Sequence, residues 1–452
     1  YTYQVFPWLM DISSKLEVKS FQRRFDKIIE SFNEKNNNDK ILGSILNTFD
    51  YGQICESASI LIDAYINENL LTMYDPKFHE NLFHSIYSLL ELQFANLYND
   101  DIETELSSII SQVVSNYFKL IIPKRSSGKT FIRVQKPNYK KLQNKINIIE
   151  SRPQPDQRTD EWYKFRHNLI TASSAWKALD TQSFQNQIIY EKCCPLNLSK
   201  FKFASTESPL HWGQKYEDVS IQYYEMLYKI NVKDYGCIQH DKYSFLGASP
   251  DGINVTKNHP LYGRMLEIKN IVNREITGIP KKEYWIQMQL QMETCNLNEC
   301  DFLETRFKEY ESEEEFNKDG TFQYTESGQH KGIMLYFMKD DRPHYEYAPF
   351  CCTKQKFEEW EEKMMEKNSE HSWMKNIYWR LDEVSCVLVL RNKEWFEKAI
   401  VKIGEVWDTI EKERVSGYQH RAPKRRNDRS KQKFLGKPPA SKFSDIIKND
   451  GE

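Results

Sequence analysis

The sequence predicts an α/β domain, in which helices flank a mixed sheet, behind an all-helical N-terminal domain. Residues 264–272 form an apolar-rich run of strand length, and residues 299–307 and 332–347 also have the pattern of strands. Residues 211–230 and 282–293 instead repeat apolar side chains at three- and four-residue spacing, which is typical of helices. Helices and strands that alternate along a chain favour one sheet covered by helices.

The N-terminal part is expected to be helical up to about residue 123. Four segments there have helical apolar spacing and few glycines or prolines, namely residues 21–32, 54–71, 83–97 and 102–122. None of them contains a catalytic group of residues, so this domain could bind DNA, a partner protein or another subunit, or serve only as a packing scaffold. The polar, proline-containing residues 124–158 are expected to form a linker.

The C-terminal part is expected to complete the core and to end in a basic tail. Helices are predicted at residues 355–367 and 393–413, with a short strand at residues 384–390 between them. Basic residues and prolines are frequent in residues 413–452, which predicts a flexible tail that contacts phosphates nonspecifically or acts as a localisation signal. A solvated tail with neither role is the alternative.

Composition limits the kinds of protein this can be. A net charge of −2 over 452 residues excludes a uniformly basic nucleic-acid-binding surface, so any DNA channel has to be local. No apolar run is long enough to span a membrane and no signal segment is present, which predicts a cytoplasmic or nuclear protein, neither membrane-bound nor secreted. The nine cysteines include no C-x-x-C pair and no cluster near the chain end, so we expect reduced thiols and no iron–sulfur cluster.

Two acidic residues and a lysine form the candidate catalytic group. In the strand predicted at residues 264–272, Glu267 and Lys269 share one face, because successive side chains of a strand point to opposite sides. Asp251 follows an apolar segment, and the proline before it and the glycine after it indicate a turn. A hairpin or bend would bring Asp251 beside Glu267.

These three residue types suit metal-assisted hydrolysis of phosphodiesters. Carboxylate oxygens are ligands that Mg²⁺ and Mn²⁺ prefer, and such a site completes its coordination with water and phosphate oxygens. A metal lowers the pKa of bound water, and a nearby lysine such as Lys269 can orient that water. The alternative is that Glu267 and Lys269 form a solvated strand face and that Asp251 lies in an ordinary turn.

Each flanking helix adds one polar candidate. In the helix predicted at residues 211–230, Glu217 lies beside an apolar stripe, and a buried carboxylate there would need a metal or a lysine as partner. In the helix predicted at residues 282–293, Gln287 belongs to a polar column that could hold a water or a phosphate oxygen. At solvated helix edges, neither residue would have such a role.

The ordered motifs resemble a known family. They are WGQKYE at residues 212–217, SPDG at residues 249–252, LEIK at residues 266–269 and YWIQMQ at residues 284–289, preceded by QRTDEWYKFR at residues 157–166 and LITAS at residues 169–173. This order and spacing are similar to the YqaJ-type viral recombinases, the phage lambda exonuclease-like branch of the PD-(D/E)xK nucleases. The resemblance implies a restriction-endonuclease-like core at residues 159–412, in a protein of a large DNA virus.

The resemblance implies a metal site that holds Mg²⁺ or Mn²⁺ as one ion or two. Asp251 and Glu267 would be ligands, with the Ile268 carbonyl as a further ligand. Glu217 would complete or support a second metal site. Lys269 would activate or position water, and Gln287 would line the site.

The resemblance also implies a pocket for the 5′-phosphate of a DNA end, formed by Arg166, Ser173 and Ser249. Locally, Ser173 has the position of an N-cap before a short helix, where unpaired N–H groups favour a phosphate, and Arg166 could add a bidentate contact. Without the resemblance, Ser173 would be only a cap and Arg166 only a surface cation. Arg274 is the candidate for an arginine that the family has shortly after the motif lysine.

The implied activity is 5′-to-3′ exonucleolytic resection of duplex DNA ends, in recombination or repair. Some members of this family assemble into rings, so the resemblance also allows for a homo-oligomer of this protein. An endonuclease or a single-strand nuclease with the same metal site is one alternative. A noncatalytic DNA-binding scaffold that keeps a nuclease fold is an alternative of another class, although the intact acids and lysine argue against it.

Overall fold

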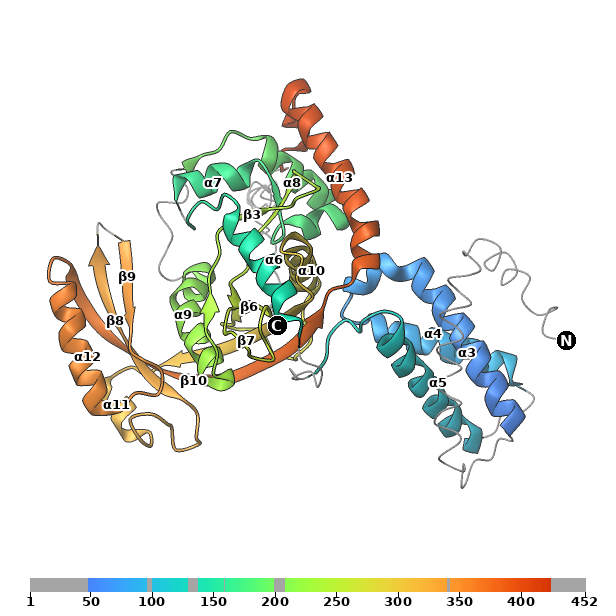
Figure 1. Cartoon of the computed structure of the whole chain (residues 1–452), viewed down its shortest axis with the longest axis horizontal. Coiled ribbons are helices and arrows are strands. Elements are labelled where there is room, and N and C mark those ends of the chain that lie inside the picture. Colours follow the sequence, from blue (N-terminus) through green and yellow to red (C-terminus); the bar gives the residue numbers. More distant parts are fainter. Residues whose placement is uncertain are drawn as a thin grey trace, which may run out of the picture.

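A computed structural model describes residues 48–95, 100–128, 137–157, 159–198, 208–339 and 342–423. The helix predicted at residues 21–32 and the greater part of the predicted basic tail lie outside these ranges. Within them the chain has a mixed α/β core and a helical N-terminal region, so the predicted fold class is confirmed (Figure 1). None of the described helices is long and apolar enough to cross a membrane.

A mixed seven-stranded sheet forms the centre of the core, in the order β2-β5-β6-β7-β10-β8-β9. Its strands are β2 (Val232–Lys233), β5 (Gly252–Asn254), β6 (Met265–Asn270), β7 (Glu299–Glu309), β8 (Lys331–Lys339), β9 (Arg342–Tyr347) and β10 (Ser372–Leu390). The pair β6 and β7 is parallel, whereas the other neighbouring pairs are antiparallel. A small second sheet consists of β1 (Ile170–Thr171), β4 (Leu246–Ala248) and β3 (Ile238–Gln239).

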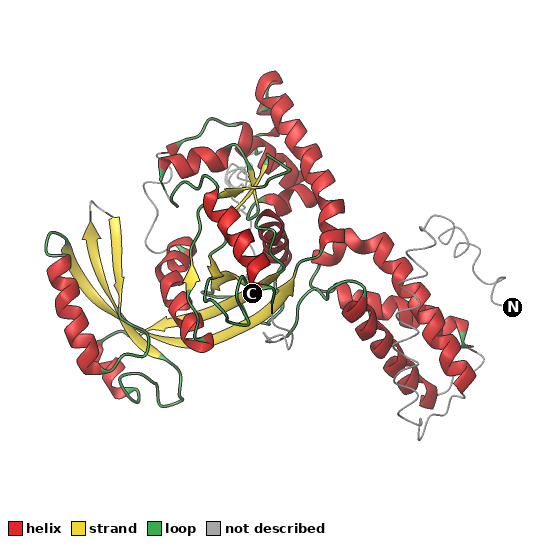
Figure 2. Cartoon of the chain, viewed as in Figure 1, coloured by secondary structure: helices red, strands yellow, loops and turns green. Residues whose placement is uncertain are grey.

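Strand β10 is much longer than the strand predicted at residues 384–390. It begins at Ser372, pairs first with β8 and then with β7, and so continues the sheet into an arm beside α11 (Glu313–Lys318) and α12 (Lys354–Lys367), as Figure 2 shows. The sequence does not predict the first half of β10, because apolar and polar residues alternate along it. Ile377, Trp379 and Leu381 are buried, and polar or half-buried residues separate them, so it has no continuous apolar run.

Two helices cover opposite faces of the sheet around β6. Helix α9 (Pro209–Tyr228) packs Tyr216 and Tyr224 against Leu266 and Ile268, the two apolar side chains on one face of β6. Helix α10 (Lys282–Thr294) lies on the other face and is buried from Trp285 onward.

Shorter helices complete the core above the small sheet. They are α7 (Asp160–His167), the 3₁₀ helix η4 (Ala175–Leu179) and α8 (Gln182–Cys193). The long α13 (Lys393–Ser416) packs against α8 and η4, and the 3₁₀ helix η6 (Gln419–Arg421) follows it. Arg421 pairs with Glu413 at 2.6 Å, so the first residues of the segment predicted as a flexible tail are folded.

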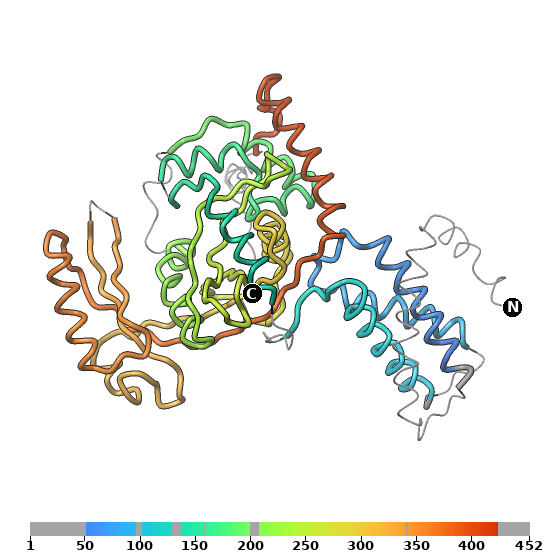
Figure 3. The backbone as a smooth tube through the Cα atoms, in the orientation of Figure 1, coloured from blue at the N-terminus to red at the C-terminus, as the bar shows by residue number. Residues whose placement is uncertain are grey.

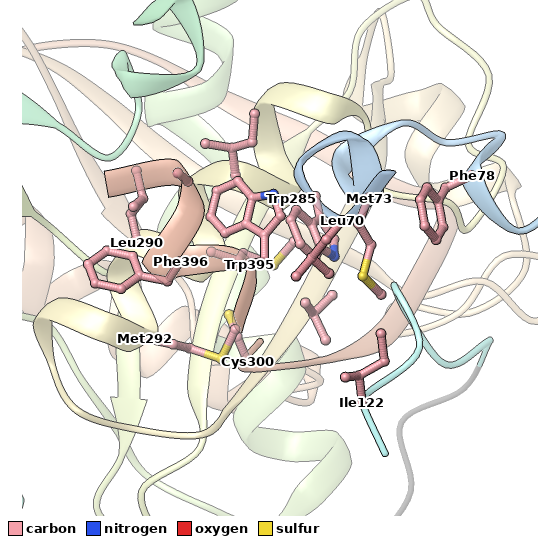
Figure 4. Packing of buried hydrophobic residues seen from close by; sticks show 14 of the residues in the cluster. Leu70, Met73, Phe78, Ile122, Trp285, Leu290, Met292, Cys300, Trp395 and Phe396 are labelled. Carbon is pink, nitrogen blue, oxygen red and sulfur yellow. The ribbon is translucent and has the colours of Figure 1, made fainter. Parts of the chain in front are cut away.

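The N-terminal helical region packs directly on the core. It contains α3 (Thr48–Asn69), the 3₁₀ helix η2 (Leu70–Tyr74), α4 (Phe78–Gln93) and α5 (Asp100–Leu120). Figure 4 shows Leu70 and Met73 of η2 beside Trp285 and Trp395, within one continuous hydrophobic cluster. Figure 3 shows the same junction in the chain path, where red α13 meets the blue segment. Here the Trp395 indole donates to the Leu71 carbonyl at 3.0 Å.

Residues 124–158 differ from the predicted linker. They include α6 (Tyr139–Ser151), whose Ile146 and Ile149 are buried in the main hydrophobic cluster. Arg125 is 2% exposed and donates to the carbonyl of Tyr74 at 2.9 Å, while its own carbonyl accepts the Trp285 indole N–H at 2.7 Å. These buried contacts show that a polar, proline-containing composition is compatible with a packed segment.

A buried charge network joins β6 to β7. Arg264 and Asp301 have 1% and 0% exposed side chains, with their charged atoms 3.4 Å apart, and the Tyr224 hydroxyl donates to Asp301 at 2.6 Å. We expect Arg264→Met to lower the free energy of unfolding by about 3–5 kcal/mol, because it leaves a buried carboxylate without its cation. Urea unfolding measures the loss.

The control is Lys233→Met, which breaks a 2.8 Å ion pair with Glu150 whose side chains are 50% and 37% exposed. It should cost less than about 1 kcal/mol. Equal losses in the two variants would contradict the role given to the buried network.

Candidate active site

Two connected hollows open over the edge of β6. The large cavity has a volume of about 980 Å³ and is lined by residues of α7, α9 and β6 and of the segment after β6, including Glu217, Lys269 and Arg274. The small pocket, about 160 Å³, is lined by Ser173, Ser249 and Gln287. Four residues line both hollows, namely Gln157, Trp162, Arg166 and Asp251. The candidate residues from distant motifs therefore meet around one continuous space.

The pairing of β5 with β6 brings the two predicted acids together. Gly252 is paired with Leu266 in the antiparallel register, so the preceding residue, Asp251, lies opposite Glu267. The Asp251 carboxylate accepts a hydrogen bond from the Ile268 backbone N–H at 2.7 Å. A Cβ atom at Gly252 would lie 2.1 Å from the Val232 side chain, which explains why β5 begins with glycine.

Glu267 and Lys269 share one face of β6, as the strand pattern predicted. The Glu267 side chain is fully buried, and the ammonium of Lys269, whose side chain is 23% exposed, forms an ion pair with it. The Lys269 ammonium also lies 5.1 Å from the centre of the Tyr284 ring. The charged face of the strand is therefore turned toward α10 and the cavity rather than toward open solvent.

Burial and neighbouring charges shift the pKa of Asp251 and of Lys269. Burial, reinforced by the charge of Glu267, raises the pKa of Asp251 well above its usual range. For Lys269, burial opposes the charge, but Glu267 and Asp251 outweigh it and raise the lysine's pKa. The site thus concentrates negative charge that one lysine only partly balances.

Gln291 belongs to this site although the sequence analysis assigned the role to Gln287. Its amide nitrogen donates to Glu267 at 2.7 Å and to the Ser249 carbonyl at 3.1 Å, and its side chain is completely buried. Gln287, one turn earlier, lines the small pocket instead. The four-residue spacing of the two glutamines was visible in the sequence, but their burial depends on the packing of α10 against the sheet.

Glu217 reaches the large cavity from α9. It is half-buried, and its charge is among those that raise the pKa of Asp251. Asn270 fixes this helix relative to β6, because its amide donates to the Gly213 carbonyl at 2.6 Å and accepts from the Ser220 hydroxyl at 2.7 Å. The helix therefore holds Glu217 near the strand that carries Glu267.

The donor set fits a divalent cation. In the described residues no three His, Cys, Asp or Glu side chains converge into a ready metal cluster. Asp251 and Glu267 nevertheless place two carboxylates together in a buried site, which an ion would balance. The side-chain oxygen of Gln291 is buried without a hydrogen-bond partner in the part of the chain that the structure describes. A site that binds Mg²⁺ or Mn²⁺ offers the ion acceptor oxygens and negative charge, and these residues offer both.

The small pocket brings together the three residues expected to hold a phosphate. The guanidinium of Arg166 donates to the hydroxyls of Ser249 at 3.3 Å and Ser173 at 3.4 Å, and lies 4.2 Å over the Trp162 ring. Among the described residues, Arg166 forms no ion pair with a carboxylate. A partly buried cation surrounded by hydroxyl groups suits an anionic ligand.

Ser173 does not have the predicted position of an N-cap. The cap residue is Ser174, its side chain makes no capping hydrogen bond, and the helix that follows is the five-residue 3₁₀ helix η4. So short a helix contributes little dipole at this point. Any phosphate in the small pocket would therefore rely on Arg166 and the two hydroxyls.

Arg274 lines the large cavity rather than the small pocket. It forms an ion pair with the buried Glu304, and its guanidinium lies 5.5 Å from the centre of the Tyr284 ring. Tyr284 thus has two cations near its ring, Lys269 and Arg274. Arg274 therefore lies apart from the pocket that Ser173 and Ser249 line.

Part of the chain matches a known protein family. Residues 161–298 match the YqaJ-like viral recombinase domain. These residues are therefore similar to that domain, and the resemblance inferred from the motifs is confirmed. An uncharacterized protein of Acanthamoeba polyphaga mimivirus is 29% identical over 348 residues, which cover 68% of this chain and 61% of that protein. The chain thus spans about three-fifths of the length of this curated relative.

Solved structures give weaker likenesses. An alkaline exonuclease from Laribacter hongkongensis is 17% identical with a TM-score of 0.34, over 58% of this chain and 97% of the exonuclease. Its complex with dAMP has the same identity, 17%, and the same TM-score, 0.34. Likenesses at this level do not bear on function.

Gln291 offers a test of the metal site. Gln291→Leu removes the donor that orients Glu267, and we expect it to weaken Mn²⁺ binding by about 10–100-fold, as is usual for residues that orient ligands. Electron paramagnetic resonance of free Mn²⁺ measures the affinity. Gln289→Leu is the matched control, because Gln289 is equally buried in α10 but binds the Leu390 carbonyl at 2.9 Å. Equal weakening in both variants would contradict the role of Gln291.

Proposed function

We propose that this protein is a divalent-metal-dependent deoxyribonuclease that resects duplex DNA ends from 5′ to 3′ in recombination or repair. The observation that carries the proposal is the continuity of the two hollows. Asp251 and Lys269 line the large cavity, and Asp251 also lines the small pocket with Arg166, Ser173 and Ser249. Glu267 lies buried beside them, in an ion pair with Lys269. This geometry suits a strand whose terminal phosphate is held while a neighbouring phosphodiester lies over the acids.

The roles of the site residues follow from their contacts. Asp251 and Glu267, with the Ile268 carbonyl, would hold one ion, and Glu217 would support a second. When bound, Mg²⁺ or Mn²⁺ supplies a water of lowered pKa and stabilises charge on the phosphate. Lys269, held by Glu267, would position the attacking water or neutralise the developing negative charge. Gln291 keeps the Glu267 carboxylate in one orientation.

End recognition would come from the small pocket. Its volume of about 160 Å³ is suited to a phosphate group rather than a nucleoside, and Arg166 supplies the charge. Gln287 lines the same pocket and would contact the phosphate or the water beside it. Arg274, with Tyr284, would contact the DNA backbone on the far side of Lys269. The nuclease unit proposed on these grounds spans residues 159–412, and a mimivirus relative suggests a viral role in the cytoplasm or nucleus.

The first test is DNA cleavage in Mg²⁺, Mn²⁺ or EDTA with linear duplexes. We expect EDTA to abolish cleavage and Asp251→Asn or Lys269→Met to slow it by about 10²–10⁴-fold, the range for a missing acid–base or electrostatic group. Asp241→Asn and Lys308→Met change the same charges on exposed residues away from the cavity and should cleave normally. Unimpaired Asp251 and Lys269 variants would refute the assigned site.

A covalently closed circle distinguishes the mode of cutting. An exonuclease leaves it intact, whereas rapid cutting of the circle would indicate an endonuclease with the same metal site. Binding of DNA without cleavage under every metal condition would indicate a noncatalytic scaffold.

The second test concerns the small pocket. Arg166→Met should reduce the preference for 5′-phosphorylated over 5′-hydroxyl duplex ends by about tenfold or more, because it removes charge-assisted hydrogen bonds to the terminal phosphate. Competition between the two substrates measures the preference. Lys164→Met, on the exposed face of the same helix α7, is the control. A wild-type protein without any preference would remove the pocket hypothesis while leaving the metal site untouched.

A further inference from the structure

A second cation beside Arg166 has no part in the proposed phosphate pocket. Lys192 lies in the last turn of α8, and its ammonium donates to the Arg166 carbonyl at 2.7 Å. It lines the large cavity together with His167, but neither residue lines the small pocket. Arg166 therefore stands at the boundary of the two hollows, with Lys192 on the side away from Ser173 and Ser249.

Positive charge accumulates around Lys192. Arg414 donates to the Lys192 carbonyl at 2.9 Å and to the His167 carbonyl at 3.3 Å, so it holds α7 and α8 together from behind. Neither Lys192 nor Arg166 forms an ion pair with a carboxylate in the described residues. Glu191, which precedes Lys192 in α8, is instead paired with Lys177 at 2.9 Å. Two cations on one cavity wall thus lack a carboxylate partner in the part of the chain that the structure describes.

The protonation of these groups reflects the same imbalance. Burial, followed by the charge of Arg166, lowers the pKa of Lys192 to about 7, with Glu191 opposing and Arg414 adding to the decrease. Burial, Lys192 and Arg414 also lower the pKa of His167. An anion in the large cavity would relieve this repulsion, because it would favour the charged form of Lys192.

We infer that Lys192 is a second phosphate-binding residue, which contacts a non-terminal backbone phosphate of DNA in the large cavity. The inference rests on the proposed function and adds a contact to it. A strand with its end phosphate in the small pocket must continue into the large cavity, where Lys192 and His167 form one wall. Lys192 then contributes to the binding of every DNA duplex, whereas Arg166 and the two serines contribute only to the binding of 5′-phosphorylated ends.

Binding without cleavage tests this role. Full-length protein in EDTA is titrated with duplexes that carry either a 5′-phosphate or a 5′-hydroxyl, over a range of salt concentrations. We expect Lys192→Met to weaken binding of both duplexes by the same factor, about tenfold, as for one charge-assisted contact. The slope of log affinity against log salt should fall by about one, the value for one lost phosphate contact. Lys164→Met, which removes the same charge from the exposed face of α7, should change neither.

A duplex with single neutral methylphosphonates locates the contact without relying on a variant's stability. In the wild type, one non-terminal position should weaken binding, Lys192→Arg should retain that sensitivity, and Lys192→Met should abolish it. Absence of any sensitive non-terminal position would overturn the inference. A Lys192→Met loss confined to 5′-phosphorylated duplexes would also overturn it, because Lys192 would then belong to the terminal pocket.

The two proposals fail in different ways. A wild-type protein that neither binds nor cleaves DNA contradicts the proposed function. A wild-type protein that does both, with Lys192→Met unchanged in affinity and salt slope, contradicts only the second phosphate contact. A thermal unfolding curve of Lys192→Met separates loss of contact from loss of the hydrogen bond that holds the end of α7.

Discussion

The candidate site depends on the register between β5 and β6. Because Gly252 pairs with Leu266, Asp251 lies opposite Glu267 and receives the Ile268 N–H. A slip of one residue would turn Glu267 and Lys269 toward the apolar surface of α9 and point Leu266 into the cavity, which burial forbids. The hydrophobic packing of Leu266 and Ile268 therefore sets the position of the charged residues on the opposite face.

Two buried acids near that strand each have two polar partners. Glu267 has both Lys269 and Gln291, and Asp301 has both Arg264 and Tyr224. The difference lies in exposure. The Asp301 network is closed on all sides and serves stability, whereas Lys269 is partly exposed and Gln291 retains an unpaired oxygen. Incomplete pairing at the cavity is consistent with a site that takes its remaining ligands from outside the chain.

The helical N-terminal region supports this site from behind. Helix η2 packs against α10 and α13, and Lys282 at the start of α10 pairs with Asp180 and lies 5.3 Å from the centre of the Tyr74 ring. Since α10 carries Gln287 and Gln291, the packing of the two parts helps to fix the glutamines. The outer helices of this region do not line either hollow. They are not used to build the cavity, so the packing leaves them available for binding.

The sequence by itself determined the local structure around the motifs. Period-two alternation placed Glu267 and Lys269 on one face of a strand. The ordered motifs singled out Asp251 and Arg166 as candidates and carried the resemblance to the YqaJ-like viral recombinase domain, which residues 161–298 match. The features that depend on long-range packing were decided only by the tertiary structure. It buried Gln291, folded residues 139–151 onto the core, extended β10 to Ser372 and brought Lys192 to the wall beside Arg166. Local patterns report which face a side chain takes, but burial and charge compensation depend on elements far apart in the chain.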